Sequence, residues 1–316
     1  MITPRVTVCI PAYNNARFLP EAIESVLSQS FDQLELLIID DSSTDSTREI
    51  VSSYAARDNR IVFRVNPRNI GMVENWNACL REARGEYIKY LFGDDLLASP
   101  DALQKMVGVL DSDRTVSLVA SARNLIDEDS ALVGTISCFA GNTVGEGAKI
   151  INRCLLTQKN LIGEPSVVMF RKSQAARGFD ARYSQFVDLE MWFHLLEQGK
   201  FSYIGEPLAS FRLHAGQQTR KNVRDLVHVD EMIALMDEYG GRPYVKLGQI
   251  TRRFLQYHQL YRIWKVYRNG TMSREDALVK ISRHCAPRKF LALVPLYKVV
   301  SPVWKLKCFV GSLAGK

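Results

Sequence analysis

The sequence has no long hydrophobic run. No segment reaches about 18 uninterrupted apolar residues, so we expect no membrane-spanning helix. Residues 1–10 lack a charged segment followed by a long apolar stretch, so we expect no cleaved signal peptide either. The six cysteines are scattered, without a C-x-x-C pair, which disfavours a disulfide framework and a zinc site. These absences predict a cytoplasmic protein.

Charge is unevenly distributed along the chain, although the net value is only +7. Residues 241–316 contain 16 Lys and Arg against two acids, whereas residues 1–240 contain 25 Lys and Arg against 32 acids. A strongly basic region beside an acidic body predicts a polyanion as its partner, such as an anionic membrane surface. We recognise no nucleic-acid-binding motif and expect no nucleic-acid partner.

The first hundred residues alternate between strand and helix patterns. Short β-rich or apolar runs predict strands at 5–10, 34–39, 61–65 and 86–92. Helical spacing of apolar residues predicts helices at 18–29, 46–56 and 73–83. This alternation predicts an α/β fold with a doubly wound, mostly parallel sheet.

The second half of the sequence is less regular. We expect further strands at 118–122 and 166–171 and helices at 149–156 and 188–197, with a glycine-rich loop at 134–147. From about Val223 the pattern is helical until Pro287, and Pro295 and Pro302 are expected to interrupt any long helix beyond it.

Polar clusters follow each of the first four predicted strands. They are Tyr13-Asn14-Asn15, Asp40-Asp41, residues 66–69 and Asp94-Asp95. In such sheets ligands bind in the crevice beyond the carboxyl ends of the strands. Because the four clusters would meet at one edge, together they predict a binding site.

The two acidic pairs suggest different chemistry, and each has a structural alternative. Gly93-Asp94-Asp95 suits a hard divalent cation, which takes oxygen ligands and bridges them to phosphates; alternatively it is an acidic turn before a helix. Asp40-Asp41 would accept a hydrogen bond from a base N–H or a ribose hydroxyl, or it is simply a strand-to-helix turn. Neither GxGxxG nor GxxxxGKS/T occurs, which disfavours dehydrogenases and P-loop NTPases.

Seven blocks in order resemble one known family. They are residues 6–13 (VTVCIPAY), 38–45 (IIDDSSTD), 69–71 with Asn77, 89–95 (KYLFGDD), 164–166 (EPS), Asp188 with Trp192, and 211–214 (FRLH). Their order and spacing are similar to those of the family 2 glycosyltransferases, and they cover about residues 5–220. The resemblance implies a GT-A-type, Rossmann-like α/β fold, here with a helical C-terminal extension.

The resemblance also implies roles for individual residues. Asp188 would be the catalytic base, and Asp95 would ligate a divalent cation, Mn²⁺ or Mg²⁺. A larger group would bind the nucleotide sugar, with the first three wrapping the nucleobase and the last two closing over the diphosphate or acceptor: Pro11, Ala12, Tyr13, Asp41, Asn69, Asn77, Asp94, Arg212 and His214. Gly93 stands where relatives often have a third acid, which removes one contact.

The region beyond the resemblance is interpreted from its own residues. We expect a catalytic domain at 1–222 and a basic, mainly helical region at 223–316. Residues 291–310 mix apolar side chains with lysines, which is typical of an interfacial anchor on anionic lipid; alternatively they close the core of a helical subdomain. Residues 217–221 (QQTRK) resemble the Q-Q-x-R-W signature of processive synthases, but Lys221 replaces the tryptophan, so we predict single additions.

The predicted reaction is transfer of a sugar, with inversion, from a nucleotide-sugar donor to an acceptor hydroxyl. UDP is the expected nucleotide, and the acceptor would be a glycan or a lipid-linked glycan, as in surface polysaccharide synthesis. One alternative is a catalytically silent nucleotide-sugar-binding protein at the membrane. Another is a nucleotidyltransferase, which usually has a glycine-rich loop after its first strand, whereas residues 11–16 contain no glycine.

Overall fold

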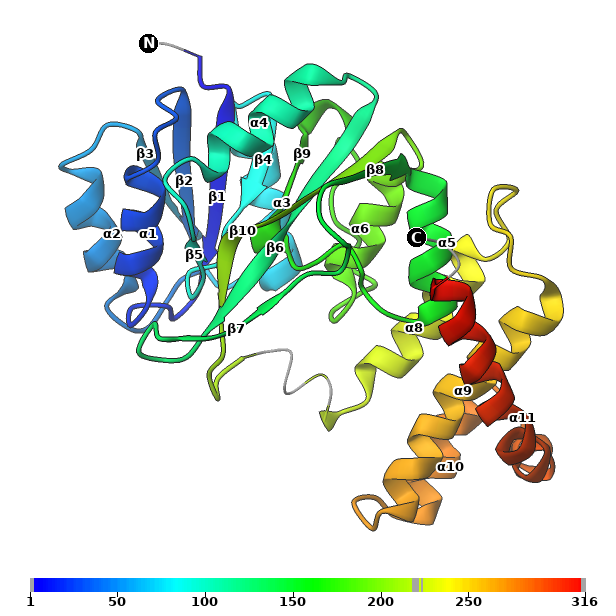
Figure 1. Ribbon diagram of the computed structural model, residues 1–316. Helices are drawn as coiled ribbons and strands as arrows, with labels where there is room; N and C mark the ends of the chain where they lie inside the picture. The colour runs from blue at the N-terminus through cyan, green and yellow to red at the C-terminus, as the bar shows by residue number, and fades with distance from the viewer. Residues whose placement is uncertain (1–2, 218–221, 223, 314–316) are drawn as a thin grey trace. The chain divides into compact units, whose positions relative to one another are not determined.

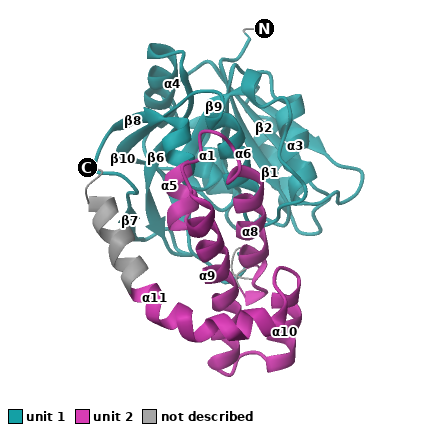
Figure 2. Ribbon diagram, turned by 90° about the vertical axis from the view of Figure 1, so that its right-hand side faces the viewer, with its two compact units in different colours: residues 1–151, 160–221 teal, residues 152–159, 222–316 magenta. Residues whose placement is uncertain are grey.

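The computed structural model describes residues 3–217, 222 and 224–313 of the chain. The chain forms two compact units, one of residues 1–151 and 160–221 and the other of residues 152–159 and 222–316 (Figure 2). In the described part of the chain, no helix has both the length and the apolarity needed to cross a membrane. Of the QQTRK segment at 217–221, residues 218–221 lie outside the described part.

A ten-stranded sheet organises the first unit, in the order β3-β2-β1-β4-β9-β6-β10-β5, with β7 on β6 and β8 on β10 (Figure 1). The strands are β1 (Val6–Ala12), β2 (Leu34–Asp40), β3 (Ile61–Val65), β4 (Tyr87–Tyr90), β5 (Leu96–Leu97), β6 (Val116–Ile126), β7 (Leu132–Ile136), β8 (Thr143–Glu146), β9 (Val168–Arg171) and β10 (Lys200–Arg212).

The six principal strands of this sheet run in one direction. β1, β2, β3 and β4 pair in parallel, and β6 pairs in parallel with β10. β9 is antiparallel to both β4 and β6 and joins the two parallel sets. The mostly parallel, doubly wound sheet is therefore confirmed. The carboxyl ends of six strands meet at one edge, and the strand order reverses between β1 and β4, where ligands bind in open α/β sheets.

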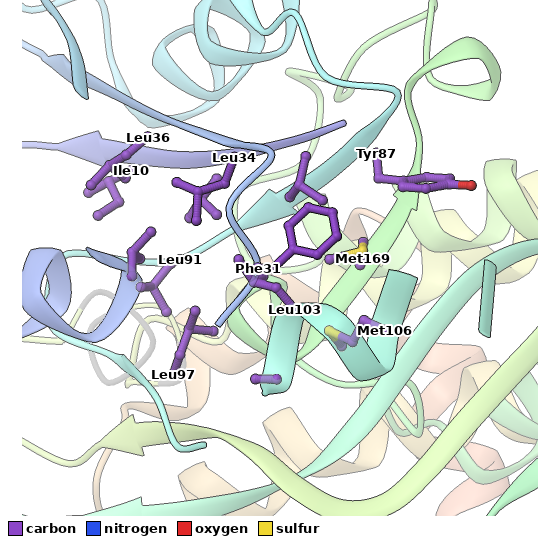
Figure 3. Packing of buried hydrophobic residues seen from close by; sticks show 14 of the residues in the cluster. Ile10, Phe31, Leu34, Leu36, Tyr87, Leu91, Leu97, Leu103, Met106 and Met169 are labelled. Carbon is purple, nitrogen blue, oxygen red and sulfur yellow. The ribbon is translucent and has the colours of Figure 1, made fainter. Parts of the chain in front are cut away.

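Helices cover both faces of the sheet. On one face alternate residues of β1, such as Val8 and Ile10, pack with β2 against α1 (Leu19–Leu27), α2 (Thr47–Ala55) and α4 (Ala102–Ser112) (Figures 1 and 3). Side chains of a strand point alternately to its two faces, so Cys9 faces the other side, where its thiol lies 3.9 Å from the Cys79 carbonyl oxygen.

An aromatic cluster fills this second face. α3 (Met72–Glu82) contributes Trp76, and α6 (Val187–Leu196) contributes Trp192. The Phe179 ring lies between them, with its centroid 5.2 Å from Trp76 and 6.3 Å from Trp192, and it meets Tyr90 of β4 edge-on. The helix that carries Asp188 is thereby held to the sheet by large buried rings.

The second unit is helical. It contains α8 (Val227–Tyr239), α9 (Gln249–Arg268), α10 (Arg274–Ser282) and α11 (Pro287–Leu313), and residues from Asn152 onward of α5 (Gly147–Thr157) group with it. The prediction that two prolines interrupt any long helix is wrong, because α11 continues through Pro295 and Pro302. Both rings are exposed, so water can reach the carbonyl groups that the missing N–H groups leave free.

The expected loop at 134–147 is also wrong in part. It contains the end of β7, which pairs with β6, and all of β8, which pairs with β10. Gly134 and Gly145 signalled a loop, but both lie in short strands added at the side of long ones, where the ladder to the partner outweighs their weak strand preference.

Candidate active site

The loops after β1 and β2 are fastened together at the carboxyl edge of the sheet. The backbone N–H of Asn14 donates to Ser43 Oγ at 2.9 Å, and the side-chain oxygen of Asn14 accepts from the Thr44 N–H at 2.8 Å. One residue further on, the backbone N–H of Asn15 donates to Thr47 Oγ1 at 3.1 Å. Asn14 has φ of 53°, a left-handed conformation that asparagine tolerates well. The edge therefore has a fixed shape around the predicted nucleobase site.

The three residues predicted to wrap the nucleobase have different surroundings. Pro11 is half-buried, and Ala12 is fully buried in the core, where its carbonyl oxygen accepts the Asp41 N–H at 2.8 Å. Tyr13 is 48% exposed at the end of the strand. Among the three, Tyr13 has the side chain best placed to stack on a ligand.

Asp41 holds the loop that follows β3. Its carboxylate is buried and accepts three hydrogen bonds, from Asn66 Nδ2 at 2.8 Å, the Ile70 N–H at 2.9 Å and the Gly71 N–H at 3.0 Å. Asn69 is exposed in this loop, and its side-chain oxygen accepts the Gly71 N–H at 3.1 Å. An ionised carboxylate has about four acceptor positions, so Asp41 keeps one for a base or ribose donor.

Asp95 follows β4 and contacts the segment before β9 and the end of β10. It is 1% exposed; Ser166 Oγ donates to it at 2.5 Å and the Arg212 backbone N–H at 3.0 Å. Burial raises the pKa of Asp95 well above its usual range, and the neighbouring charge of Asp94 raises it further. Two adjacent carboxylates, one of them desolvated, form a site that a cation would stabilise.

Asp94 is paired with His214. The Nε2 atom of His214 lies 2.9 Å from Asp94 Oδ2, and its Nδ1 accepts the Gly216 N–H at 3.2 Å. Since Nδ1 accepts, it carries no proton, so the Nε2–H tautomer donates to the carboxylate. The two residues predicted from separate motifs thus meet in one hydrogen bond.

Arg212 is fully buried and its guanidinium is committed to protein acceptors. Nε donates to the Asp94 carbonyl at 2.9 Å, one terminal nitrogen donates to Ser130 Oγ at 2.8 Å, and the other pairs with Glu21 of α1 at 3.0 Å. Phe18 lies under the guanidinium. The resemblance implied that Arg212 closes over the diphosphate or acceptor; in the structure these contacts position the Asp94–Asp95 turn.

Lys89 is a buried group that the sequence analysis left without a role. Its ammonium donates to the Tyr90 carbonyl at 3.1 Å and to the Ser166 carbonyl. Burial lowers the pKa of Lys89 to about 7, against the opposing attraction of Asp95. Lys89 and Ser166 both lie inside motif blocks. The position of Ser166 at the start of the strand predicted at 166–171 was the signal that could have identified it as a site residue.

Asp188 is the first acid in α6, where the helix macrodipole favours it. Asn160 Nδ2 donates to Asp188 Oδ2 at 3.1 Å, and the same side chain accepts the N–H groups of Ile162 and Gly163 at 3.1 and 2.9 Å. Trp192 also donates to the Gly163 carbonyl at 3.0 Å. The segment 160–166 therefore links the two acids: Asn160 at its start bonds to Asp188, and Ser166 at its end bonds to Asp95.

The Asn77 side chain binds the backbone of the loop that contains Phe179. Its side chain donates to the Phe179 carbonyl at 3.0 Å and accepts the Phe179 N–H at 2.7 Å. At Gly178, with φ of 78°, a Cβ atom would lie 2.6 Å from the Asn77 side-chain oxygen, so the loop passes very close. Asn77 therefore holds this loop to α3.

The arrangement suits chemistry on a diphosphate. Among the described residues no group of three or more acidic, histidine or cysteine side chains is positioned to hold a metal. Asp94 and Asp95 fit a cation that takes one or two carboxylates and completes its shell with substrate phosphates and water, which is common for Mg²⁺. Asp188, one loop away, can accept a proton.

The chain is similar in sequence and in fold to known proteins. The sequence profile of "Glycosyl transferase family 2" matches residues 7–175. An uncharacterized protein of Mycobacterium tuberculosis (strain CDC 1551 / Oshkosh) is 30% identical over 237 residues, which are 70% of this chain and 73% of that protein. The chondroitin synthase of Escherichia coli is 30% identical over 216 residues, 68% of this chain but only 30% of the synthase.

Two solved structures share the fold. Staphylococcus aureus TarS 1–349 in complex with UDP-GlcNAc has a TM-score of 0.66 at 15% identity, covering 96% of this chain and 89% of that one. Mannosyltransferase PcManGT from Pyrobaculum calidifontis, in complex with GDP-Man and Mn²⁺, has a TM-score of 0.58 at 17% identity, covering 99% and 88%. The profile match covers more than half of the chain and coincides with the strand-end residues, and both structural neighbours are GT-A-type transferases. The chain therefore belongs to glycosyl transferase family 2 and is a glycosyltransferase.

Proposed function

We propose that this enzyme transfers a sugar from a UDP-sugar to an acceptor hydroxyl, with inversion and with a divalent cation at Asp95. The observation that carries the proposal is the Asp94–Asp95 pair at the reversal of strand order. There one carboxylate is buried and the other bonds to His214. A UDP-sugar in one structural neighbour and GDP-Man with Mn²⁺ in another support a nucleotide-sugar donor and a divalent ion.

The residues around this pair would bind the donor. Tyr13 would stack on the base, and Asp41 would accept one hydrogen bond from it through its remaining acceptor position. Asp95 would ligate Mn²⁺ or Mg²⁺, and when bound the cation would neutralise charge on the leaving diphosphate. Asp94 would lie beside the ribose or the sugar. Arg212 would act through Asp95, because its backbone N–H and its guanidinium hold the acidic turn from two sides.

Asp188 would supply the base. Its carboxylate takes the proton of the acceptor hydroxyl while that oxygen forms a bond to the anomeric carbon, and the bond from this carbon to the diphosphate breaks. Attack from the face opposite the diphosphate inverts the configuration. Asn160 holds one carboxylate oxygen at 3.1 Å, which fixes the direction in which the base faces.

The second unit supports a proposal for the acceptor and the location. We place transfer in residues 1–222 and acceptor or membrane association in residues 223–316. The excess of lysine and arginine after residue 240 suits a lipid-linked glycan acceptor at the cytoplasmic face of an anionic membrane.

Donor binding followed by calorimetry tests the proposal. UDP-GlcNAc, UDP-glucose and GDP-mannose would be titrated with Mn²⁺, with Mg²⁺ and with EDTA, into wild type, Asp95→Asn and Asp188→Asn, with Asp32→Asn as the matched control. Asp32 is exposed and lies before β2, at the opposite end of the strand from Asp41.

We expect cation-dependent binding of a UDP-sugar that is lost in Asp95→Asn and kept in Asp188→Asn and Asp32→Asn. Donor hydrolysis or transfer should disappear in Asp188→Asn alone among the variants that bind donor. Binding without any turnover in wild type would favour the silent binding protein. Absence of nucleotide-sugar binding under all three conditions would refute the proposal.

A further inference from the structure

Helix α11 has one face packed within the second unit. Phe290 is fully buried, with its ring 5.0 Å from that of Tyr257 and 5.8 Å from that of Trp264, both on α9. Two turns later the Tyr297 ring lies 4.5 Å from Tyr261, again on α9. These contacts fix which side of α11 faces inward.

Another side of α11 is apolar and exposed. We call Leu293, Leu296, Val299 and Val300 the α11 strip. Leu296 is 59% exposed and Val299 is 73% exposed. At 100° per residue the four side chains occupy an arc of about 120°, whose centre lies about 110° around the helix from Phe290 and Tyr297. A group of aliphatic side chains this exposed on a single helix normally has a partner.

The charge around the α11 strip is positive. Arg288 and Lys289 are exposed and lie on the same side of α11 as the strip, whereas Lys298 is exposed on the other side, and α11 contains no acid. In residues 241–316 the only acids are Glu275 and Asp276, at the start of α10. An apolar strip among cations matches a surface that is negative outside and apolar beneath.

We propose that the α11 strip inserts into the headgroup region of an anionic phospholipid bilayer, with Arg288 and Lys289 on the lipid phosphates. The helix would lie in the plane of the membrane surface, since no described helix can cross it. The proposed function supplies the expectation of a membrane partner; the strip and its charges identify the contacting surface. A protein partner would bury the strip equally well, but it would gain little from a rim of one sign of charge.

Vesicle co-sedimentation of the full chain tests this surface. The vesicles are pure phosphatidylcholine, or phosphatidylcholine with about a third phosphatidylglycerol. The test variant is the double change Leu296→Ser with Val299→Ser. Its matched control is Ile250→Ser with Val279→Ser, which removes equally exposed aliphatic side chains (86% and 56% exposed) from α9 and α10. All of these positions are at the surface, so the thermal midpoint of each variant should equal that of wild type.

We expect wild type to bind anionic vesicles at least tenfold more tightly than neutral ones, and to lose this preference in 0.5 M NaCl. The α11 variant should bind about tenfold more weakly, and the control should bind as wild type does. Equal binding by all three proteins, or no vesicle binding, would overturn the proposal.

Two further measurements separate other occupants of the strip. Light scattering would reveal a dimer that only the α11 variant loses, which would make the strip a contact between copies of this chain. Retention on single-stranded RNA that only this variant loses would assign the surface to nucleic acid. Vesicle binding needs no nucleotide sugar, so a failure here leaves donor binding intact, and a failure of donor binding leaves this test unaffected.

Discussion

Replacing Asn160 by aspartate tests whether Asp188 is the base and whether Asn160 orients it. The two side chains are isosteric, and the introduced carboxylate would still accept the Ile162 and Gly163 N–H groups as the asparagine oxygen does. The Nδ2 group is lost, and with it the hydrogen bonds to Asp188 Oδ2 and to the Gly163 carbonyl, each at 3.1 Å, and a second negative charge takes its place. The turn keeps its two N–H bonds while the hydrogen-bond donor beside the base becomes a negative charge.

The expected effect is large because the charges are close. Two unit charges about 4 Å apart interact by roughly 4 kcal/mol at an effective dielectric constant near 20, or about 3 pH units at about 1.4 kcal/mol per unit. Asp188 is partly exposed, so solvent reduces this interaction. We expect the acid limb of the profile of log kcat against pH to move up by roughly 1 to 2 pH units, with activity largely recovered above the new midpoint.

The assay is initial-rate transfer or donor hydrolysis between pH 5 and 9, with the cation and donor saturating. Asn142→Asp adds a carboxylate at another exposed turn of the same unit, where the asparagine oxygen accepts the Gly205 N–H at 2.9 Å, and should leave the profile unchanged. An Asn160→Asp enzyme that loses activity equally at every pH would refute the reasoning, because the loss would then come from structure and not from the base.

Three further predictions concern other contacts of the fold. His214→Gln should lower kcat/KM about tenfold with little change in the thermal midpoint, because one charge-assisted hydrogen bond is lost; an unchanged kcat/KM would remove His214 from the site. Glu190→Gln breaks the bidentate pair between the buried Glu190 and the partly exposed Arg177 and should reduce the free energy of unfolding by about 2 kcal/mol in urea titrations, whereas Glu74→Gln at an exposed pair should change it by less than about 0.5 kcal/mol. Similar losses for both would contradict this. Burial lowers the pKa of His228 to about 4. As the pH falls below about 6.5, the unfolded chain therefore binds a proton at this histidine, whereas the folded chain does so only near pH 4. Wild type should therefore lose roughly 2 kcal/mol between pH 7 and pH 4.5 beyond any loss seen in His228→Gln, and parallel curves for the two proteins would count against this assignment.

The parallel half of the sheet was predictable because its strands are short apolar runs that end in polar residues. β2 is buried over its whole length and its sequence, LELLIID, is nearly continuous in apolar residues. β10 was missed, since Gly205 and Pro207 interrupt its pattern. The structure absorbs both in register shifts against β6 between Ile204 and Ala209, a long-range adjustment that no local pattern contains.

In the candidate site, individual residues were predictable but their long-range contacts were not. Strand-end position and family motif identified Asp41, Asp94 and Asp95. Neither could show that Arg212 is buried and committed to protein acceptors, because its partners come from segments more than 80 residues away. The link between Asp188 and Asn160 likewise depends on how α6 packs, which aromatic rings from three elements determine.

The fastened loops after β1 and β2 have a consequence for ligand discovery. Because hydrogen bonds within the protein already fix Asn14 and Asn15, a small molecule that reaches this edge need not order the backbone there. Binding of a fragment then loses little affinity to conformational entropy, and the affinity per heavy atom of a uridine-sized fragment should approach that of the whole nucleotide. Soaking such fragments into crystals of the ligand-free enzyme is therefore a realistic route to inhibitors of this glycosyltransferase.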